Sequence, residues 1–120
     1  MSVPTPIELV ETHGRQFPEE LATTLGFAVE RQEQSPVLPG VTVLSEYKPE
    51  GRILLFLPAL RKLAERRAQP LTQVEQWHIA HELYHGLAES TAPASWRVRE
   101  TEADLWADEL LTLVTVSPLS

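Results

Sequence analysis

Prolines set the strongest limit on how this chain can fold. The 120-residue sequence contains ten of them, and proline is tolerated in the first turn of a helix but breaks helix interiors and sheet ladders. Near the N-terminus, Thr5, Pro6 and Glu8 fit a capping box with proline in the first turn. A second helix start lies at Pro18, and Gly26 can end that stretch in a left-handed conformation. The first quarter of the chain is therefore predicted to be helical, as one broken helix.

The middle of the chain changes to a pattern that is typical of strands. Residues 27–31, 41–47 and 52–57 carry β-branched and aromatic side chains with partial alternation. Between the last two segments, the residues at 48–51 (Lys-Pro-Glu-Gly) suit a tight turn. We therefore predict three short antiparallel strands, of which 41–47 and 52–57 form a hairpin.

The rest of the chain returns to a helical pattern. Apolar residues recur at helical spacing over 58–69. A second helix is predicted over 72–89, where Thr72 and Glu75 fit a capping box, and a third over 95–116. The sequence thus predicts an α+β fold: an N-terminal helix, a small three-stranded antiparallel sheet, and then helices. Because we find no repeat, low-complexity tract or linker, residues 1–120 are interpreted as a single domain.

Composition excludes several classes of site and partner. The net charge of −7 disfavours nucleic acid and anionic membranes as partners. The absence of cysteine excludes disulfides and thiolate metal sites. The N-terminus has no signal-peptide pattern, and the longest apolar stretch near the C-terminus, 110–116, is too short to span a bilayer. We therefore expect a soluble, cytoplasmic protein.

The most specific chemical signal is the run His-Glu-Leu-Tyr-His at 81–85, in the middle of the predicted 72–89 helix. His81 and His85 are four residues apart, so one helical turn places both imidazoles on one face, where they can bind one Zn²⁺. Glu82 is rotated by about 100° from His81. That position suits a general base, which takes a proton from a water molecule at the metal. The alternative is an ordinary pair of surface or core histidines beside a helix glutamate.

A catalytic zinc site needs a third protein ligand and an open position for water. The two remaining histidines, His13 and His78, are predicted to be solvent-exposed or core residues. The predicted last helix instead offers carboxylates at three positions: Glu100, Glu102 and Asp104.

Glu100 and Asp104 share one helix face because they are four residues apart. Glu100 can then reach the metal, while Asp104 accepts a hydrogen bond from a ligand imidazole and fixes its tautomer. Glu102 points about 200° away from Glu100, so only one of the two can face the zinc. Glu100 is favoured and Glu102 remains the alternative; a solvated acidic face with no ligand is the third interpretation.

These two motifs resemble those of the ImmA/IrrE-like metallopeptidases. That family is written as A-H-E-L-x-H followed by E-x-E-A-[N/D]-x-F-A-x-E-L-L. The chain matches the first part at 80–85 and the second at 100–111, with Trp106 in place of the phenylalanine. The resemblance covers about residues 72–113 and implies a minimal zincin-like domain of the gluzincin type.

The resemblance also implies a function and a set of site residues. It implies a zinc site of His81, His85 and Glu100, with Glu82 as the general base and Zn²⁺ as the cofactor. The implied reaction is hydrolysis of a peptide bond in an intracellular protein, such as a transcriptional repressor. We expect an extended substrate to add as a strand to the edge of the sheet, at residues 52–57.

Two other functions stay open. A domain of the same fold can bind zinc and serve as a regulatory or toxin–antitoxin-like binding module that hydrolyses nothing. The feature that separates this alternative from the enzyme is the group that would stabilise the oxyanion, for which Tyr47 and His78 are the candidates. The second alternative is a helical domain that holds no metal.

Overall fold

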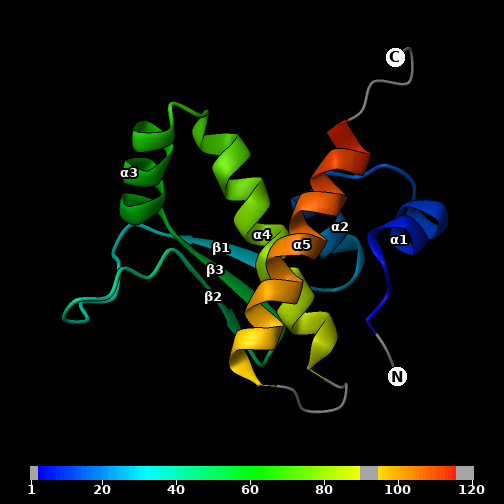
Figure 1. The fold of residues 1–120 in the computed structure, drawn as a ribbon, viewed down its shortest axis with the longest axis horizontal. Helices are drawn as coiled ribbons and strands as arrows, with labels where there is room; N and C mark the ends of the chain where they lie inside the picture. Colours follow the sequence, from blue (N-terminus) through cyan, green and yellow to red (C-terminus); the bar gives the residue numbers. More distant parts are fainter. Residues whose placement is uncertain (1–2, 90–94, 116–120) are drawn as a thin grey trace.

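A computed structural model describes residues 3–89 and 95–115 of the chain (Figure 1). In chain order its elements are α1 (Pro6–His13), α2 (Pro18–Thr24), β1 (Ala28–Gln32), β2 (Ser45–Lys48), β3 (Arg52–Phe56), α3 (Leu57–Arg67), α4 (Leu71–Ala88) and α5 (Trp96–Thr115). The predicted α+β class and the order of helices, strands and helices are confirmed. The break predicted between the last two helices, at 91–94, and the predicted end of the last helix at 116 lie outside the described residues.

The N-terminal helices begin at the residues that the sequence indicates. Thr5 caps α1 in a complete capping box: its hydroxyl accepts from the backbone N–H of Glu8, and the Glu8 carboxylate accepts from the backbone N–H of Thr5. Pro18 begins α2, so the break is complete and the segment forms two separate helices. Gly26 follows α2 with a φ of +90°, a conformation that strongly favours glycine.

The predicted capping box at the start of α4 is wrong. The helix begins at Leu71, and its N-cap is Pro70, which has no side chain that can accept a hydrogen bond. Thr72 therefore lies inside the first turn, and Glu75 is buried rather than reaching back to a cap. The Glu75 carboxylate instead pairs with Arg31 on β1, so a distant partner replaces the local one.

The sheet is mixed, which corrects the prediction of three antiparallel strands. Its order is β1-β3-β2; β2 and β3 form the predicted antiparallel hairpin, but β1 pairs with β3 in parallel. Residues 52–56 thus lie in the centre of the sheet, and the expectation that a substrate adds at 52–57 is wrong. The near-continuous burial of 53–56 is typical of a central strand. The edges are β1 and β2.

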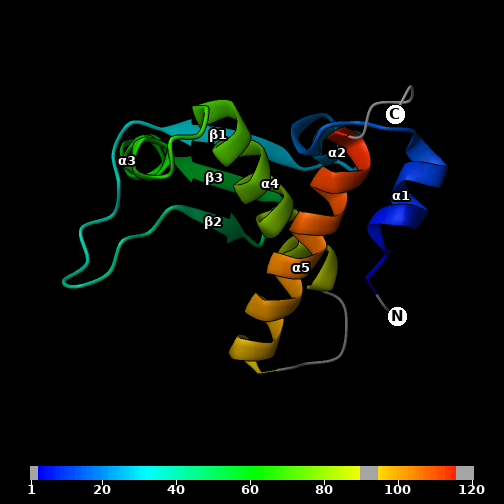
Figure 2. The same ribbon diagram turned by 45° about the horizontal axis from the view of Figure 1, so that its top comes forward.

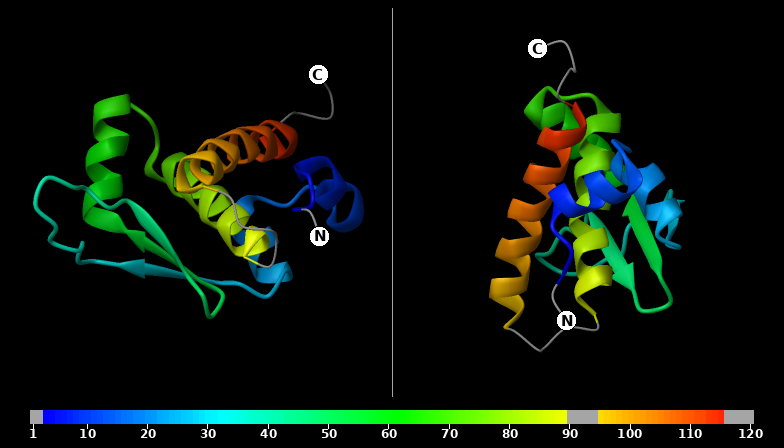
Figure 3. Two further views of the ribbon diagram at one scale, coloured as in Figure 1. Left: turned by 60° about the horizontal axis from the view of Figure 1, so that its bottom comes forward. Right: turned by 90° about the vertical axis from the view of Figure 1, so that its right-hand side faces the viewer.

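Helix α4 lies between the sheet and α5, as the views in Figure 2 and Figure 3 show together. The core on both sides of it is apolar; its largest fully buried hydrophobic side chains are Leu21, Ile53, Leu55, Leu60, Ile79, Leu83 and Leu110. Gly86 lets α4 approach the sheet: a Cβ there would lie 2.5 Å from Phe27 and 2.8 Å from Tyr47. The close packing therefore depends on the missing side chain.

Helix α5 packs along the other side of α4 and also anchors the segment that precedes α1. Ser95 caps it by accepting from the backbone N–H of Val98. Trp106 is buried, and its indole N–H donates to the carbonyl of Pro4 over 2.9 Å, which fixes the segment before α1. No helix in the described ranges is long and apolar enough to cross a membrane.

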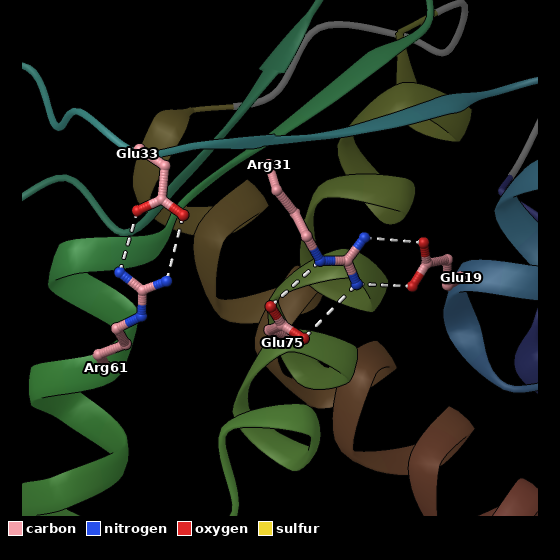
Figure 4. A network of polar contacts seen from close by, with 5 residues as sticks. All are labelled: Glu19, Arg31, Glu33, Arg61 and Glu75. Carbon is pink, nitrogen blue, oxygen red and sulfur yellow. Dashed lines mark hydrogen bonds and ion pairs between the residues drawn. The ribbon is translucent and has the colours of Figure 1, made fainter.

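A polar network joins β1 to two helices (Figure 4). The guanidinium of Arg31 forms two hydrogen bonds with Glu19 on α2, at 2.9 and 2.8 Å, and two with Glu75 on α4, at 3.2 and 3.5 Å. These contacts lower the pKa of Glu19 and raise that of Arg31. The side chain of Glu75 is only 8% exposed, so Arg31 supplies the charge that this buried carboxylate needs.

We predict that Arg31→Met destabilises the fold by about 2–3 kcal/mol. The expected loss of stability is smaller than the usual cost of breaking a buried ion pair, because Arg31 is partly exposed and water screens part of its interaction with Glu75. Urea unfolding with a metal chelator present measures the change. Arg61→Met is the matched control: Arg61 forms a similar two-bond fork with Glu33, but the two side chains are 52% and 68% exposed, so little change is expected. Equal effects of the two substitutions would contradict the role given to Arg31.

Candidate metal centre

Helix α4 carries the chemical groups of the candidate site on a buried segment. Its interior from Leu71 to Ala88 contains no proline, so the helix is continuous through the motif. His78, His81 and Glu82 are buried, and His85 is partly exposed. The two motif histidines face α5, and their ring centroids lie 4.9 Å apart.

Three side chains bring their donor atoms together between α4 and α5. The Nε2 atoms of His81 and His85 are 3.3 Å apart. Carboxylate oxygens of Glu100 lie 3.2 Å from Nε2 of His81 and 2.8 Å from Nε2 of His85. Taken as one donor atom from each residue, the three atoms all lie within 4.8 Å of one another. The structure therefore forms one His-His-Glu group that can hold a metal ion.

The spacing of these atoms fits a small tetrahedral cation. Zn²⁺ binds nitrogen and oxygen ligands at about 2.0–2.1 Å, so neighbouring ligands of a tetrahedral site are roughly 3.3 Å apart. The distances between His81, His85 and Glu100 are close to this value. The donor set, two imidazoles and one carboxylate, is also one that zinc uses in catalytic sites.

The surroundings of His81 favour the tautomer that a metal requires. Its Nδ1 lies 2.9 Å from Oδ1 of Asp104, which places a carboxylate beside the nitrogen that must carry the proton if Nε2 is to bind a metal. The contact is within ion-pair distance but not well aligned: Nδ1 is buried and has no hydrogen-bond partner of good geometry among the described residues. Asp104 thus takes the position expected of an outer partner.

Trp77, one turn before His81, fixes the same ring from its face. The two rings are stacked, with centroids 5.4 Å apart and planes 26° apart. The Trp77 indole N–H in turn donates to Asp108 on α5 over 2.7 Å. Sequence analysis missed this contact, although a tryptophan four residues before a candidate ligand shares its helix face and could have been noticed.

Glu82 lies beside the donor group but is held by a different element. The hydroxyl of Ser45, the first residue of β2, donates to Oε2 of Glu82 over 2.6 Å. Burial raises the pKa of Glu82, while the hydrogen bond from Ser45 and the neighbouring His81 and His85 oppose that rise. Ser45 was also missed by sequence analysis, since no local pattern connects β2 with α4.

His78 is a core residue, in agreement with one of the two environments predicted for it. Its side chain is buried next to Trp77, and its Nδ1 lies 3.3 Å from Oγ of Ser45. Burial lowers the pKa of His78 to about 4, with smaller contributions from His81 and Arg67. The ring is therefore neutral at pH 7.

The remaining candidates have other partners. Glu102 accepts a hydrogen bond from the hydroxyl of Tyr84, so it is Glu100 that the structure brings to the histidines. The Tyr47 hydroxyl donates to Glu89 over 2.7 Å, and burial is the main cause that raises its pKa to about 12. As placed, Tyr47 is therefore not directed at a substrate oxyanion.

An open groove of about 1050 Å³ lies next to the site, bordered by α2, the first half of α4 and the second half of α5. Trp77, His78 and Asp108 form part of its wall. His81, His85 and Glu100 do not line it, so the groove is a neighbour of the donor group and not the space that a metal would occupy.

Comparisons of the chain with protein-family models, with curated proteins and with solved structures found no significant match.

We predict that the protein binds one Zn²⁺ per chain and that His81→Ala and His85→Ala abolish this binding. Removing either imidazole leaves two donors, too few for a stable site. Elemental analysis after dialysis against zinc and gel filtration measures the stoichiometry. His13→Ala is the matched control, because His13 lies on α1, outside the donor group. Full zinc content in either motif variant would exclude the proposed ligands.

The two glutamates of α5 give a second prediction. Glu100→Ala should weaken zinc binding by on the order of 100-fold or more, because it removes a ligand, whereas Glu102→Ala should bind nearly as wild type. Asp104→Asn should be intermediate, with a loss on the order of 10–100-fold. Competition titration against a chromophoric chelator gives the affinities. A larger loss for Glu102→Ala than for Glu100→Ala would show that α5 is rotated from its described orientation.

Proposed function

We propose that this chain is a zinc-dependent metallopeptidase that hydrolyses peptide bonds in an intracellular protein. One observation carries the proposal: a compact His81–His85–Glu100 donor group has a separate buried carboxylate, Glu82, beside it. A site that only stores a cation does not need a second acid held apart from the ligands. The resemblance of the motifs to the ImmA/IrrE-like metallopeptidases supports the same function.

The residues of the chain divide the chemistry among them. Bound Zn²⁺ would supply a Lewis acid that polarises a peptide carbonyl and acidifies water. His81, His85 and Glu100 would hold it, while Asp104 and Trp77 orient the His81 ring. Glu82 would accept a proton from the attacking water at its carboxylate and deliver it to the leaving amine. Its raised pKa brings it closer to the working range of a general base.

We propose that the substrate binds along the outer edge of β2. β2 is an edge of the sheet, and its first residue, Ser45, contacts Glu82 directly. A peptide that added to this edge would run beside the proposed general base. We propose a protein substrate, such as a transcriptional repressor, on the strength of the resemblance alone.

A binding module of the same fold is the second candidate, and the contact of Tyr47 favours it. The Tyr47 hydroxyl is occupied by Glu89, and His78 is neutral and bound to Ser45. Neither candidate for the oxyanion is thus free for that task, which would leave a zinc-binding protein that recognises a partner without cutting it.

Glu82→Gln separates the two functions. The amide cannot accept a proton, so we expect hydrolysis to fall by on the order of 100-fold or more, while zinc content and partner affinity stay as in wild type. The zinc-loaded protein is mixed with denatured casein and with any repressor-like protein that is encoded beside its gene, and zinc-dependent fragments are identified by mass spectrometry.

Glu65→Gln is the matched control, since Glu65 is exposed on α3, and it should cut as wild type does. If the wild type binds the repressor but cuts neither protein, the binding module replaces the enzyme for these substrates. If Glu82→Gln cuts as fast as wild type, Glu82 is not the base.

A further inference from the structure

Glu82 is a carboxylate beside the donor group that does not belong to it. It directly follows His81 on α4, and both side chains are buried, so a further carboxylate lies on the same buried segment of the helix as the proposed ligands. A second carboxylate at this place is a competing ligand for any divalent cation. Zinc sites with four protein ligands are closed and structural, whereas catalytic sites keep one position open. A catalytic site here therefore requires that the Glu82 carboxylate be kept away from the metal.

The restraint is a short hydrogen bond from a strand. Oγ of Ser45 lies 2.6 Å from Oε2 of Glu82, and the same Oγ is 3.3 Å from Nδ1 of His78. A hydroxyl has one proton, and here it is donated to the carboxylate. The contact with His78 then has the ring as donor, so the neutral His78 carries its proton on Nδ1, an assignment made from the hydrogen-bond network.

We propose that Ser45 is a positioning residue: its hydroxyl, oriented by His78, keeps the Glu82 carboxylate out of the metal's ligand set and so preserves an open coordination position. The inference rests on the proposed metal centre. The chain of contacts runs from His78 through Ser45 to Glu82 and links two turns of α4 through the first residue of β2. Without it, the carboxylate would be free to turn toward the cation.

Cobalt binding tests this role without any substrate. Co²⁺ replaces Zn²⁺ in such sites, and its visible absorption reports coordination number and ligand type. Ser45→Ala should bind Co²⁺ more tightly than wild type, on the order of tenfold, comparable to the gain of one charge-assisted interaction. Its absorption spectrum should also change, because a carboxylate enters the ligand set. If Ser45 only stabilised the fold, Ser45→Ala would instead weaken Co²⁺ binding.

A double-mutant cycle identifies the group that enters. Adding Ser45→Ala to Glu82→Gln should give no gain over Glu82→Gln alone, because the competing carboxylate is already absent. A gain that persists in the double variant overturns the proposal, and so does Ser45→Ala that binds Co²⁺ as wild type does or more weakly.

If circular dichroism shows that the alanine variant does not fold, two other variants replace it in the same test: the isosteric pair Ser45→Thr and Ser45→Val. Both are good strand formers, and only threonine keeps the hydroxyl. Threonine should match wild type and valine should bind more tightly; equal affinities would overturn the proposal. Failure of the wild type to bind Co²⁺ or Zn²⁺ is a different outcome, because it removes the metal centre itself and with it this inference.

Discussion

The burial of ionisable side chains along one helix is the constraint on which the rest of this structure depends. Besides Tyr84, four such residues of α4 are buried: Glu75, His78, His81 and Glu82. A buried charge or polar group is costly unless it has a partner. The partners come from three other elements, Arg31 on β1, Ser45 on β2 and Asp104 on α5. The helix that carries the chemistry is thus also the one to which the sheet and the last helix are fixed.

This arrangement sets the rotation of α4 in two independent ways. Turning the helix by one residue, about 100°, would separate Glu75 from Arg31 at one end and Glu82 from Ser45 near the middle. It would also place the Cβ of a larger residue where Gly86 now meets Phe27 and Tyr47. Polar pairing and close packing therefore require the same orientation, and the donor atoms are in position before any ligand arrives. Preorganisation of this kind reduces the cost of binding.

Local sequence patterns predicted those features whose causes are local. The spacing of His81 and His85, and of Glu100 and Asp104, follows from the helical period, and the hairpin follows from its turn. The parallel pairing of β1 was predicted wrongly because the alternation of a short strand does not specify its neighbour. The capping box at Thr72 failed for a related reason: Glu75 has a stronger partner in Arg31, 44 residues away. Ser45 could not be found from the motif, since it meets Glu82 only through the packing of β2 on α4.

The acidic face of α5 would couple the binding of a cation to folding. Three carboxylates follow one another at intervals of four residues: Glu100, Asp104 and Asp108. Such like charges repel and destabilise a helix, but each of these contacts an N–H or ring nitrogen of α4, at His85, His81 and Trp77. These contacts offset the repulsion within α5 and attach α5 to α4. A cation at the His-His-Glu group would add to that attraction, so its binding free energy would stabilise the docking of α5. Since the apolar core packs without it, losing the cation should loosen this interface before it unfolds the chain.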